Sequence, residues 1–245
     1  MRRNIALFLM ICLLFGSACA EEFVYGTSER GRELVCTRIG DAEASKAMLI
    51  TFAVHGFEDA FDHDGQVLAD IAQKIIAHYQ ADASGLNGHA LYVVACANPD
   101  GLIDGESKDG FGRLNAQGID INRDFPVQWE RMTTARYRTG EEPFATAEAR
   151  ALRDLVEKIQ PAWAVDVHGW INGVYGDKAL AKPFQKAFRF EHRKYKSGGK
   201  LSQWLAEETE AAVLVELPAS PARKDYAENC ARRLITALDS WFAGM

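Results

Sequence analysis

Apolar and polar positions follow two different periods along the chain, and together they predict a series of strands and helices. Short apolar runs rich in β-branched and aromatic residues predict buried strands, and apolar residues three and four positions apart predict covering helices. Strands are predicted at 22–40 (two short ones about a turn at 28–31), 48–54, 90–97, 163–167 and 211–217, and helices at 67–80, 145–159, 201–209 and 225–242. Residues 102–129 and 169–199 show neither period and are predicted to be long irregular loops.

Strands alternate with helices through most of the chain, which is typical of α/β proteins. No internal repeat, low-complexity tract or linker divides the 245 residues. We therefore predict a single α/β domain over residues 21–245, with a mixed, mostly parallel central sheet flanked by helices.

The N-terminus has a pattern of its own. Arg2 and Arg3 precede an apolar segment at 5–15, and Ala18-Cys-Ala follows. This order predicts a secretory signal peptide at 1–20, since the apolar segment is too short to span a bilayer. A lipoprotein linked through Cys19 is a weaker alternative, because Gly16 stands where a leucine is usual. The mature chain is therefore expected to be secreted or periplasmic.

Composition narrows the class of protein further. The chain is 48% hydrophobic and 25% charged, with a net charge of −6, so no basic surface favours nucleic acid. No other stretch has membrane-spanning length. The predicted mature chain keeps Cys36, Cys96 and Cys230, an odd number that allows at most one disulfide. Cys96 and Cys230 fall at buried positions of a strand and a helix, so free thiols are expected.

Three potential metal ligands follow predicted buried strands. His55 ends one strand and Glu58 comes three residues later, whereas His168 ends another strand. The carboxyl ends of neighbouring parallel strands lie side by side, so these side chains can converge. Two imidazoles and a carboxylate, with one open position, are the ligands of a catalytic zinc. Asp166 either orients one of the ligands through a hydrogen bond or is merely an acid paired near a strand end.

Glu216 is the candidate base. It lies within the apolar strand 211–217, where a carboxylate is costly unless it is paired or functional. Beside a zinc-bound water it would accept a proton. A salt-bridged structural glutamate is the alternative interpretation.

Between about Leu49 and Pro218 the chain resembles the zinc carboxypeptidases of the carboxypeptidase A family. The resemblance rests on a series of motifs in the family's order: His55-x-x-Glu58, Asn98-Pro-Asp-Gly101, Arg113-x-Asn115, Gly118-x-Asp-x-Asn-Arg-x-Phe125, His168 and Glu216-Leu217. It implies one Zn²⁺ held by His55, Glu58 and His168, with Glu216 as general base.

The resemblance also implies roles for residues that would otherwise be read as surface side chains. Arg113 would stabilise the oxyanion, and Asn122 with Arg123 would bind the substrate's terminal carboxylate, which a guanidinium matches well. Tyr195 resembles the family's mobile tyrosine, with Tyr175 as the fallback. Ser202 falls where these enzymes set side-chain preference, and a serine suggests neither aromatic nor basic substrates.

The compact chain, with motifs at 136–140 and 159–163, looks closest to the bacterial murein tripeptide amidases, which cut between γ-D-glutamate and diaminopimelate. Together with a signal peptide, this predicts a secreted zinc peptidase whose partner is a murein-type peptide. A conventional metallocarboxypeptidase is the alternative. An aspartoacylase-type deacylase fits the signal peptide less well, and an inactive zinc-bearing binding module fits Glu216 and Arg113 less well.

Overall fold

The computed structural model describes residues 20–41 and 43–245, so the predicted signal peptide lies outside the described residues apart from Ala20. The strands are β1 (Glu21–Thr27), β2 (Glu33–Gly40), β3 (Ala47–Phe52), β4 (Ala90–Val94), β5 (Ser107–Leu114), β6 (Trp163–Gly169), β7 (Gly173–Gly176), β8 (Glu191–Arg193) and β9 (Ala211–Leu217). The helices are α1 (Gly65–Ala81), α2 (Pro99–Asp104), α3 (Ala147–Ile159), α4 (Lys178–Phe188), α5 (Leu201–Glu208) and α6 (Tyr226–Phe242), with short 3-10 turns η1 (Ala83–Leu86), η2 (Ile121–Arg123) and η3 (Ala135–Tyr137).

A single mixed sheet forms the middle layer. Its strand order is β1-β2-β4-β3-β6-β9-β7-β8. The central strands β4, β3, β6 and β9 are parallel to one another, and antiparallel pairs join β1 to β2, β2 to β4 and β7 to β9. The predicted α/β domain with a mixed, mostly parallel sheet is therefore confirmed.

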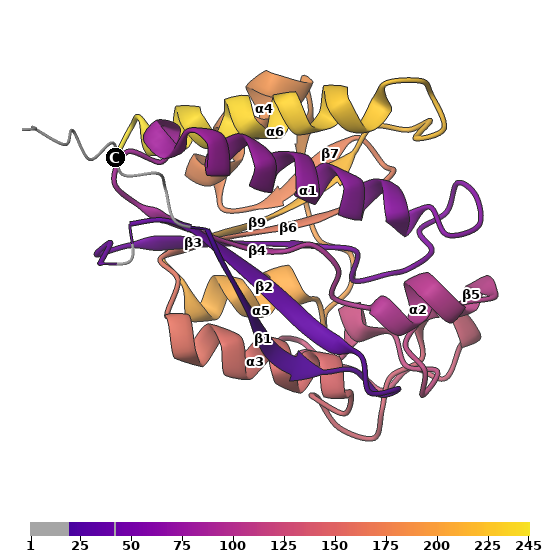
Figure 1. Cartoon of the computed structure of the whole chain (residues 1–245). Helices are drawn as coiled ribbons and strands as arrows, with labels where there is room; N and C mark the ends of the chain where they lie inside the picture. Colours follow the sequence, from indigo (N-terminus) through magenta and orange to yellow (C-terminus); the bar gives the residue numbers. More distant parts are fainter. Residues whose placement is uncertain (1–19, 42) are drawn as a thin grey trace, which may run out of the picture.

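Helices cover both faces of this sheet (Figure 1). Helices α1, α4 and α6 lie on one face, and α3 and α5 lie on the other. Two separate apolar clusters fill the spaces between the layers, one containing Phe52 and Leu234 and the other Phe125 and Leu152. Every residue of β3 is buried, as expected of a central strand covered on both faces.

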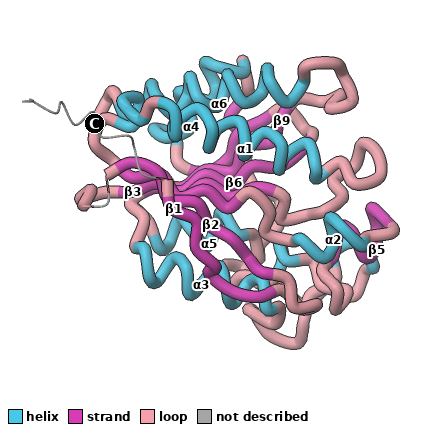
Figure 2. The backbone as a smooth tube through the Cα atoms, in the orientation of Figure 1, coloured by secondary structure: helices cyan, strands magenta, loops and turns pink. Residues whose placement is uncertain are grey.

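Long loops, together with α2 and β5, gather beyond the carboxyl ends of β3 and β6 (Figure 2). Because parallel strands direct their carboxyl ends to the same edge, the residues that follow β3 and β6 meet there. This edge carries the candidate site.

The prediction that 169–199 is irregular was wrong. This stretch contains β7, α4 and β8. The two strands are too short for their apolar pattern to be recognised, and α4 contains Pro183, which removes a backbone donor inside the helix. Asp177 caps the start of α4 by accepting hydrogen bonds from the N–H groups of Ala179 and Leu180, both at 2.8 Å.

The prediction that 102–129 is irregular was also wrong in part. It contains the end of α2, the strand β5 and the turn η2. Residues 98–101 have the Asn-Pro-Asp-Gly sequence typical of a turn, yet they begin α2, where the Asn98 side chain accepts a hydrogen bond from the Gly101 N–H at 2.9 Å. Local capping thus begins a short helix where turn residues alone suggested a loop.

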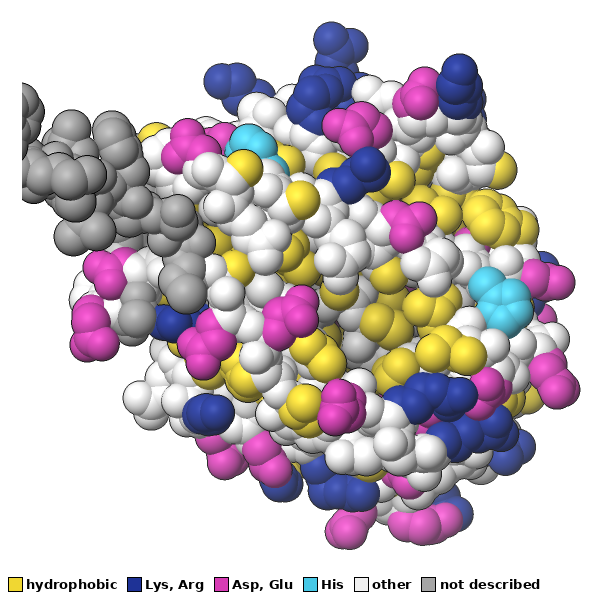
Figure 3. All heavy atoms as spheres, viewed as in Figure 1, with side chains coloured by type: hydrophobic (Ala, Val, Ile, Leu, Met, Phe, Trp, Pro, Cys, Tyr) yellow, Lys and Arg dark blue, Asp and Glu magenta, His cyan; other side chains and the backbone are white. Residues whose placement is uncertain are grey.

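The described residues include three cysteines and six α-helices. Cys36 and Cys230 are buried, Cys96 is partly buried and all three thiols are free, as predicted. Among the described helices, none has the length and apolar character that crossing a bilayer requires. Acidic and basic side chains are interspersed over the face shown in Figure 3.

Candidate metal centre and active site

The segment after β3 carries His55 and Glu58 in a tightly held turn. The backbone N–H groups of Gly56 and Phe57 both donate to the carbonyl oxygen of Gly112, at 2.9 and 3.2 Å. The carboxylate of Asp64 accepts a hydrogen bond from the N–H of Glu58 at 2.5 Å. These contacts fix the position of both side chains before any ligand binds.

The same carboxylate joins this turn to the loop that follows β6. Asp64 also accepts from the N–H groups of Asp59 and Ala60, at 3.1 and 2.7 Å, and from Nε1 of Trp170 at 2.7 Å. Asp64 is fully buried. One side chain therefore holds the two segments that carry the three candidate ligands in register.

The predicted ligands meet at one point. Their ligand atoms, one from each of His55, Glu58 and His168, lie within 4.8 Å of one another. Nδ1 of His55 is 3.1 Å from one oxygen of Glu58, and Nδ1 of His168 is 3.0 Å from the other. All three side chains are buried. The convergence expected from the strand ends is thus present.

Each imidazole is oriented from behind by a second carboxylate. Nε2 of His55 lies 3.1 Å from Asp120, and Nε2 of His168 lies 3.1 Å from Asp166. Asp166 in turn accepts a hydrogen bond from the Thr51 hydroxyl at 2.9 Å. Such contacts fix the tautomer of a metal-binding histidine and increase its basicity. Of the two interpretations of Asp166, the orienting hydrogen bond is the one found.

The electrostatics keep the acids ionised. Burial alone would raise the pKa of Glu58, but the two neighbouring imidazoles lower it below its ordinary value. Burial would likewise raise the pKa of Asp120, but His55 and Arg113 lower it. Burial opposes the charged form of His168, yet Asp166 and Glu58 raise the pKa of this imidazole well above its usual value. Glu58 and Asp120 are therefore held in their ionised forms beside the point where the ligands meet.

These residues fit zinc. Two imidazole nitrogens and one carboxylate oxygen form a common catalytic donor set. The three ligand atoms, one from each side chain, lie within 4.8 Å of one another, close enough to share one ion. Both Nδ1 atoms face the shared position, and both Nε2 atoms are held by carboxylates. Three protein donors leave one coordination position open for water or substrate.

Glu216 lies on β9 beside this group. It is the direct register partner of His168 on β6, so the two side chains project to the same face of the sheet. Its Oε2 atom is buried without a hydrogen-bond partner in the described part of the chain. Burial raises the pKa of Glu216 to about 7, against the opposing effect of His168. A carboxylate with this pKa can accept and release a proton near neutral pH.

Arg113 lies close to the acids of the metal group. Its guanidinium nitrogens are 3.7 Å from Glu58 and 3.8 Å from Asp120, and it is only 6% exposed. Its Nε atom is buried without a partner among the described residues. The positive charge is thus held next to the candidate ligands, with hydrogen-bonding capacity still available.

Arg123 and Asn122 have different environments. Arg123 donates from Nη1 to the carbonyl oxygen of Asn122 at 2.6 Å, and its Nε has no partner in the described structure. Asn122 is 3% exposed, and its Oδ1 accepts from the N–H of Leu201 at 3.0 Å. Asn122 therefore holds the start of α5 against η2, and contact between its amide and substrate stays a prediction.

Tyr195 and Ser202 are bonded to each other. The Tyr195 hydroxyl donates to the Ser202 hydroxyl at 3.0 Å, and the Tyr195 ring stacks on that of Tyr175 with centroids 5.4 Å apart. Burial raises the pKa of Tyr195. Ser202 is 1% exposed, beneath the tyrosine.

A cavity of about 370 Å³ brings several of these residues together. It includes three of the candidate site side chains and has charged and aromatic walls. Its lining residues are Arg123, Met132, Tyr137, Ile171, Tyr175, Tyr195, Lys196, Ser197, Lys200, Leu214 and Glu216.

Sequence reasoning missed Asp120, Asp64, Tyr137 and Lys200. Asp120 lies two residues before Asn122 in a motif that was recognised, so its position was a usable signal. The guanidinium carbons of Arg113 and Arg123 lie 5.7 and 5.0 Å from the centre of the Tyr137 ring, a contact between distant segments that no local pattern reveals.

Comparison with known proteins supports the same interpretation. The chain is 34% identical over 212 residues to bacteriocin BCN5 of Clostridium perfringens, a match covering 82% of this chain and 23% of that protein, so the chain spans about a quarter of the bacteriocin. It is 30% identical over 219 residues to murein peptide amidase A of Escherichia coli (strain K12), covering 80% of this chain and 83% of that protein.

Solved structures share the fold. The murein-tripeptide amidase from Escherichia coli O157 superimposes with a TM-score of 0.66 at 23% identity, covering 93% of each chain. Carboxypeptidase A from Helicoverpa armigera gives a TM-score of 0.73 at 16% identity, covering 94% of this chain and 69% of that one. The family profile described as zinc carboxypeptidase matches residues 17–236. The chain therefore belongs to the zinc carboxypeptidase family of hydrolases.

Proposed function

We propose that this protein is a zinc-dependent peptidase that hydrolyses a C-terminal amide bond of murein peptides, between γ-D-glutamate and diaminopimelate. One observation carries the proposal. A buried group of two imidazoles and a carboxylate lies beside Glu216, an unpaired acid with a pKa of about 7, which lines a cavity that also contains Arg123.

The metal would be one Zn²⁺ bound by His55, Glu58 and His168. When bound, zinc supplies Lewis acidity that polarises the scissile carbonyl and makes water a better nucleophile. Asp120 and Asp166 keep the two imidazoles facing the ion through their Nε2 atoms. Tight metal binding follows from this arrangement because the ligands need little reorganisation.

Glu216 acts as the general base. It accepts a proton from the water that attacks the carbonyl carbon, and it returns a proton to the leaving amine as the C–N bond breaks. Its raised pKa suits both transfers. Arg113 donates hydrogen bonds to the carbonyl oxygen as negative charge develops there, a contact that is strongest in the transition state.

Arg123 binds the terminal carboxylate of the substrate. Its guanidinium borders the cavity, and its Nε is free to donate in the described structure. Asn122 contributes mainly by fixing η2 to α5, with its amide next to the same anion. Tyr195 closes over the substrate when its bond to Ser202 breaks.

The murein substrate is supported by the match to murein peptide amidase A along most of both chains. A conventional metallocarboxypeptidase is the second candidate, favoured by the 32% identity over 118 residues to carboxypeptidase D of Drosophila melanogaster. That match covers only 44% of this chain, so it supports ordinary peptides less strongly than the amidase match supports murein peptides. Both kinds of substrate should therefore be tested.

The place of action is proposed from the N-terminal sequence. The order of arginines, apolar segment and Ala18-Cys-Ala supports export of the chain with cleavage after Ala20. Export would bring the enzyme to the compartment that contains peptidoglycan.

The decisive experiment uses the tripeptide L-Ala-γ-D-Glu-meso-diaminopimelate and a panel of ordinary L-peptides, with and without a chelator. We expect mass spectrometry to detect released diaminopimelate, with turnover abolished by the chelator and restored by Zn²⁺. An intact tripeptide combined with trimmed L-peptides would replace the proposal by the conventional carboxypeptidase. Turnover of neither, with zinc bound, would leave a binding module.

A further inference from the structure

The charges that line the cavity are unbalanced. Arg123, Lys196 and Lys200 contribute three cations, whereas Glu216 is the only acid among the lining residues. In the proposed function, Arg123 meets the terminal carboxylate and Glu216 transfers protons. The positive charge of Lys196 and Lys200 is left without a role.

The backbone at Lys200 is firmly held. The N–H of Gly199 donates to Val127 at 2.8 Å, and the N–H of Phe125 donates to the carbonyl oxygen of Gly199 at 3.2 Å. Leu201, which follows, donates to the side chain of Asn122 at 3.0 Å. Lys200 is therefore presented to the cavity from a fixed point at the start of α5, not from a free loop.

The ammonium of Lys200 has no anionic partner. Among the described residues it makes no hydrogen bond and no ion pair within 4.0 Å, Glu216 included, whereas the exposed Lys46 and Lys74 each contact a glutamate at 2.7 and 2.8 Å. Burial, and then the neighbouring Arg123, lower the pKa of Lys200 to about 8. A partly buried cation without a counter-charge is costly, and an anionic ligand would remove that cost.

Ser202, the position predicted to set side-chain preference, does not line this cavity. It is 1% exposed, and its hydroxyl is bonded to Tyr195. Lys200 lies two residues earlier and does line the cavity, together with Leu214 and Tyr175. The side chain of the substrate's terminal residue would thus meet a cation and not a serine.

We propose that Lys200 is a specificity-determining residue that binds a second carboxylate, located on the side chain of the substrate's C-terminal residue. This inference rests on the proposed function, because it takes Arg123 as the partner of the terminal carboxylate. Diaminopimelate has a second carboxylate of this kind at the far end of its side chain. Lysine is the same molecule without that group, which makes the two a matched pair of ligands.

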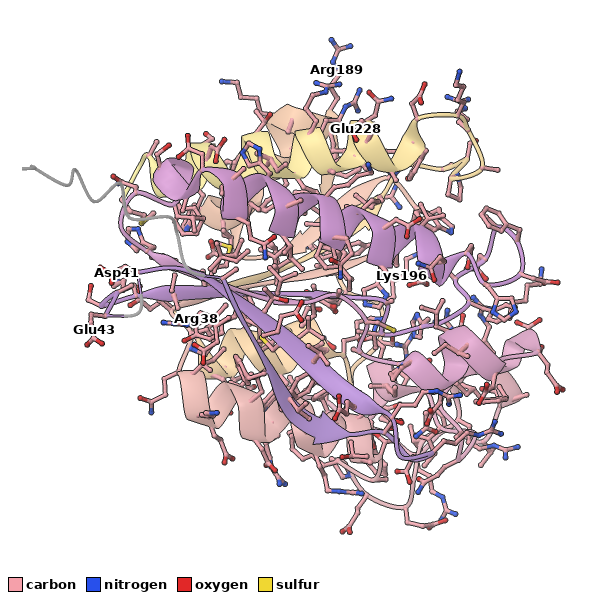
Figure 4. All side chains as sticks on the ribbon, viewed as in Figure 1. Arg38, Asp41, Glu43, Arg189, Lys196 and Glu228 are labelled. Atoms are coloured by element: carbon pink, nitrogen blue, oxygen red, sulfur yellow. The ribbon has the colours of Figure 1, made fainter. Side chains whose placement is uncertain are left out.

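The test measures binding separately from catalysis. The zinc-loaded protein is titrated calorimetrically with free meso-diaminopimelate and with L-lysine. We expect diaminopimelate to bind at least about tenfold more tightly, as one charge-assisted hydrogen bond in a partly buried site provides. Lys200→Met removes this preference, and Lys200→Glu reverses it. Lys196→Met, which alters the exposed cation of the same cavity, keeps it (Figure 4).

The binding experiment tests the role of Lys200, and a cleavage assay tests the proposed function separately. Equal affinity for the two ligands, or a preference that survives Lys200→Met, overturns the inference, and loss of the preference in Lys196→Met transfers the role to that residue and also overturns it. Cleavage of the murein tripeptide is assayed in parallel. A tripeptide that is cut while both ligands bind equally leaves the proposed function standing, whereas selective binding of diaminopimelate without cleavage supports Lys200 and removes the proposed function.

Discussion

The metal group and the adjoining cavity satisfy their polar atoms in opposite ways. Every ring nitrogen of His55 and His168 has a carboxylate partner, and both oxygens of Glu58 are engaged. Beside them, Glu216 and Arg123 each retain a buried polar atom without a partner in the described structure. The three candidate ligands are thus fully paired, although Oδ2 of Asp120 behind His55 has no hydrogen-bond partner in the described structure, whereas the cavity retains unpaired atoms on its own walls.

This contrast separates the preorganised part of the site from the part that a ligand must complete. Buried polar atoms without partners cost free energy, so they persist where a ligand supplies the missing contact. A fully connected network instead fixes the geometry of its members. Changes in the network should therefore affect metal affinity, whereas changes at the cavity should affect turnover and substrate choice.

The largest expected effect is on turnover, from Glu216→Gln. The amide keeps the shape of the side chain but cannot accept the proton, so kcat should fall by about 10²–10⁴-fold. Zinc content, measured by plasma mass spectrometry, should stay at one ion per chain. Glu191→Gln, at an exposed position on β8, is the matched control and should keep wild-type kcat. Equal loss of zinc and turnover in Glu216→Gln would mean that Glu216 belongs to the metal network.

A smaller effect is expected from the outer carboxylates. Asp120→Asn and Asp166→Asn each weaken the contact to one imidazole Nε2, so each should lower zinc affinity by about 10–100-fold. Competition against a chromophoric chelator measures this. Asp70→Asn, on the exposed side of α1, is the control. Unchanged affinity in both buried variants would show that the two contacts do not act through the metal.

The sequence could predict the metal group because its members follow directly from strands. His55 and His168 each come at the end of a buried apolar run, and topology brings such ends together. Glu216 was recognisable as a carboxylate inside an apolar strand. The register of β6 against β9 then placed it beside His168, as the strand-end argument requires.

The cavity could not be predicted in the same way. Its walls come from 123–137, 171–175, 195–200 and 214–216, segments that are distant in sequence and joined by irregular backbone. No local pattern distinguishes Lys200 from a surface lysine, and its position on the cavity wall depends on how Gly199 packs against Val127. Non-local packing, which a single sequence does not encode as a pattern, decides which side chains face the substrate.

The pH dependence of the free energy of unfolding should reveal the cost of burying Glu216 without a hydrogen-bond partner for its Oε2 atom. In the metal-free protein the folded-state pKa of Glu216 is about 7, above its ordinary 4.5. The unfolded chain therefore loses its proton first as pH rises, and wild-type stability falls between about pH 4.5 and 7. Because each pKa unit corresponds to about 1.4 kcal/mol, Glu216→Gln should gain up to about 3 kcal/mol relative to wild type above pH 7, and nothing near pH 4.

Thermal unfolding in the presence of chelator checks this expectation. Each kcal/mol gained corresponds to an increase in Tm of roughly 2–4 °C for a domain of this size, so the full gain of about 3 kcal/mol would increase Tm by up to roughly 6–12 °C. The same substitution would then stabilise the fold and abolish turnover, as expected where function retains an unsatisfied group. A Tm difference that does not change with pH would separate the effect from titration of Glu216.

The smallest expected effects concern the bond between Tyr195 and Ser202. Tyr195→Phe and Ser202→Ala remove the same hydrogen bond, so each should lower the free energy of unfolding by about 0.5–1.5 kcal/mol, and the double variant should lose no more than either alone.

The kinetics of the two variants separate the roles of Tyr195 and Ser202. If the tyrosine hydroxyl reaches the substrate, Tyr195→Phe lowers kcat/KM by up to about tenfold while Ser202→Ala leaves it near wild type. Equal kcat/KM values in the two variants would instead mean that the Tyr195 hydroxyl serves only to hold Ser202. Contact with the substrate would then be restricted to the charged residues of the cavity.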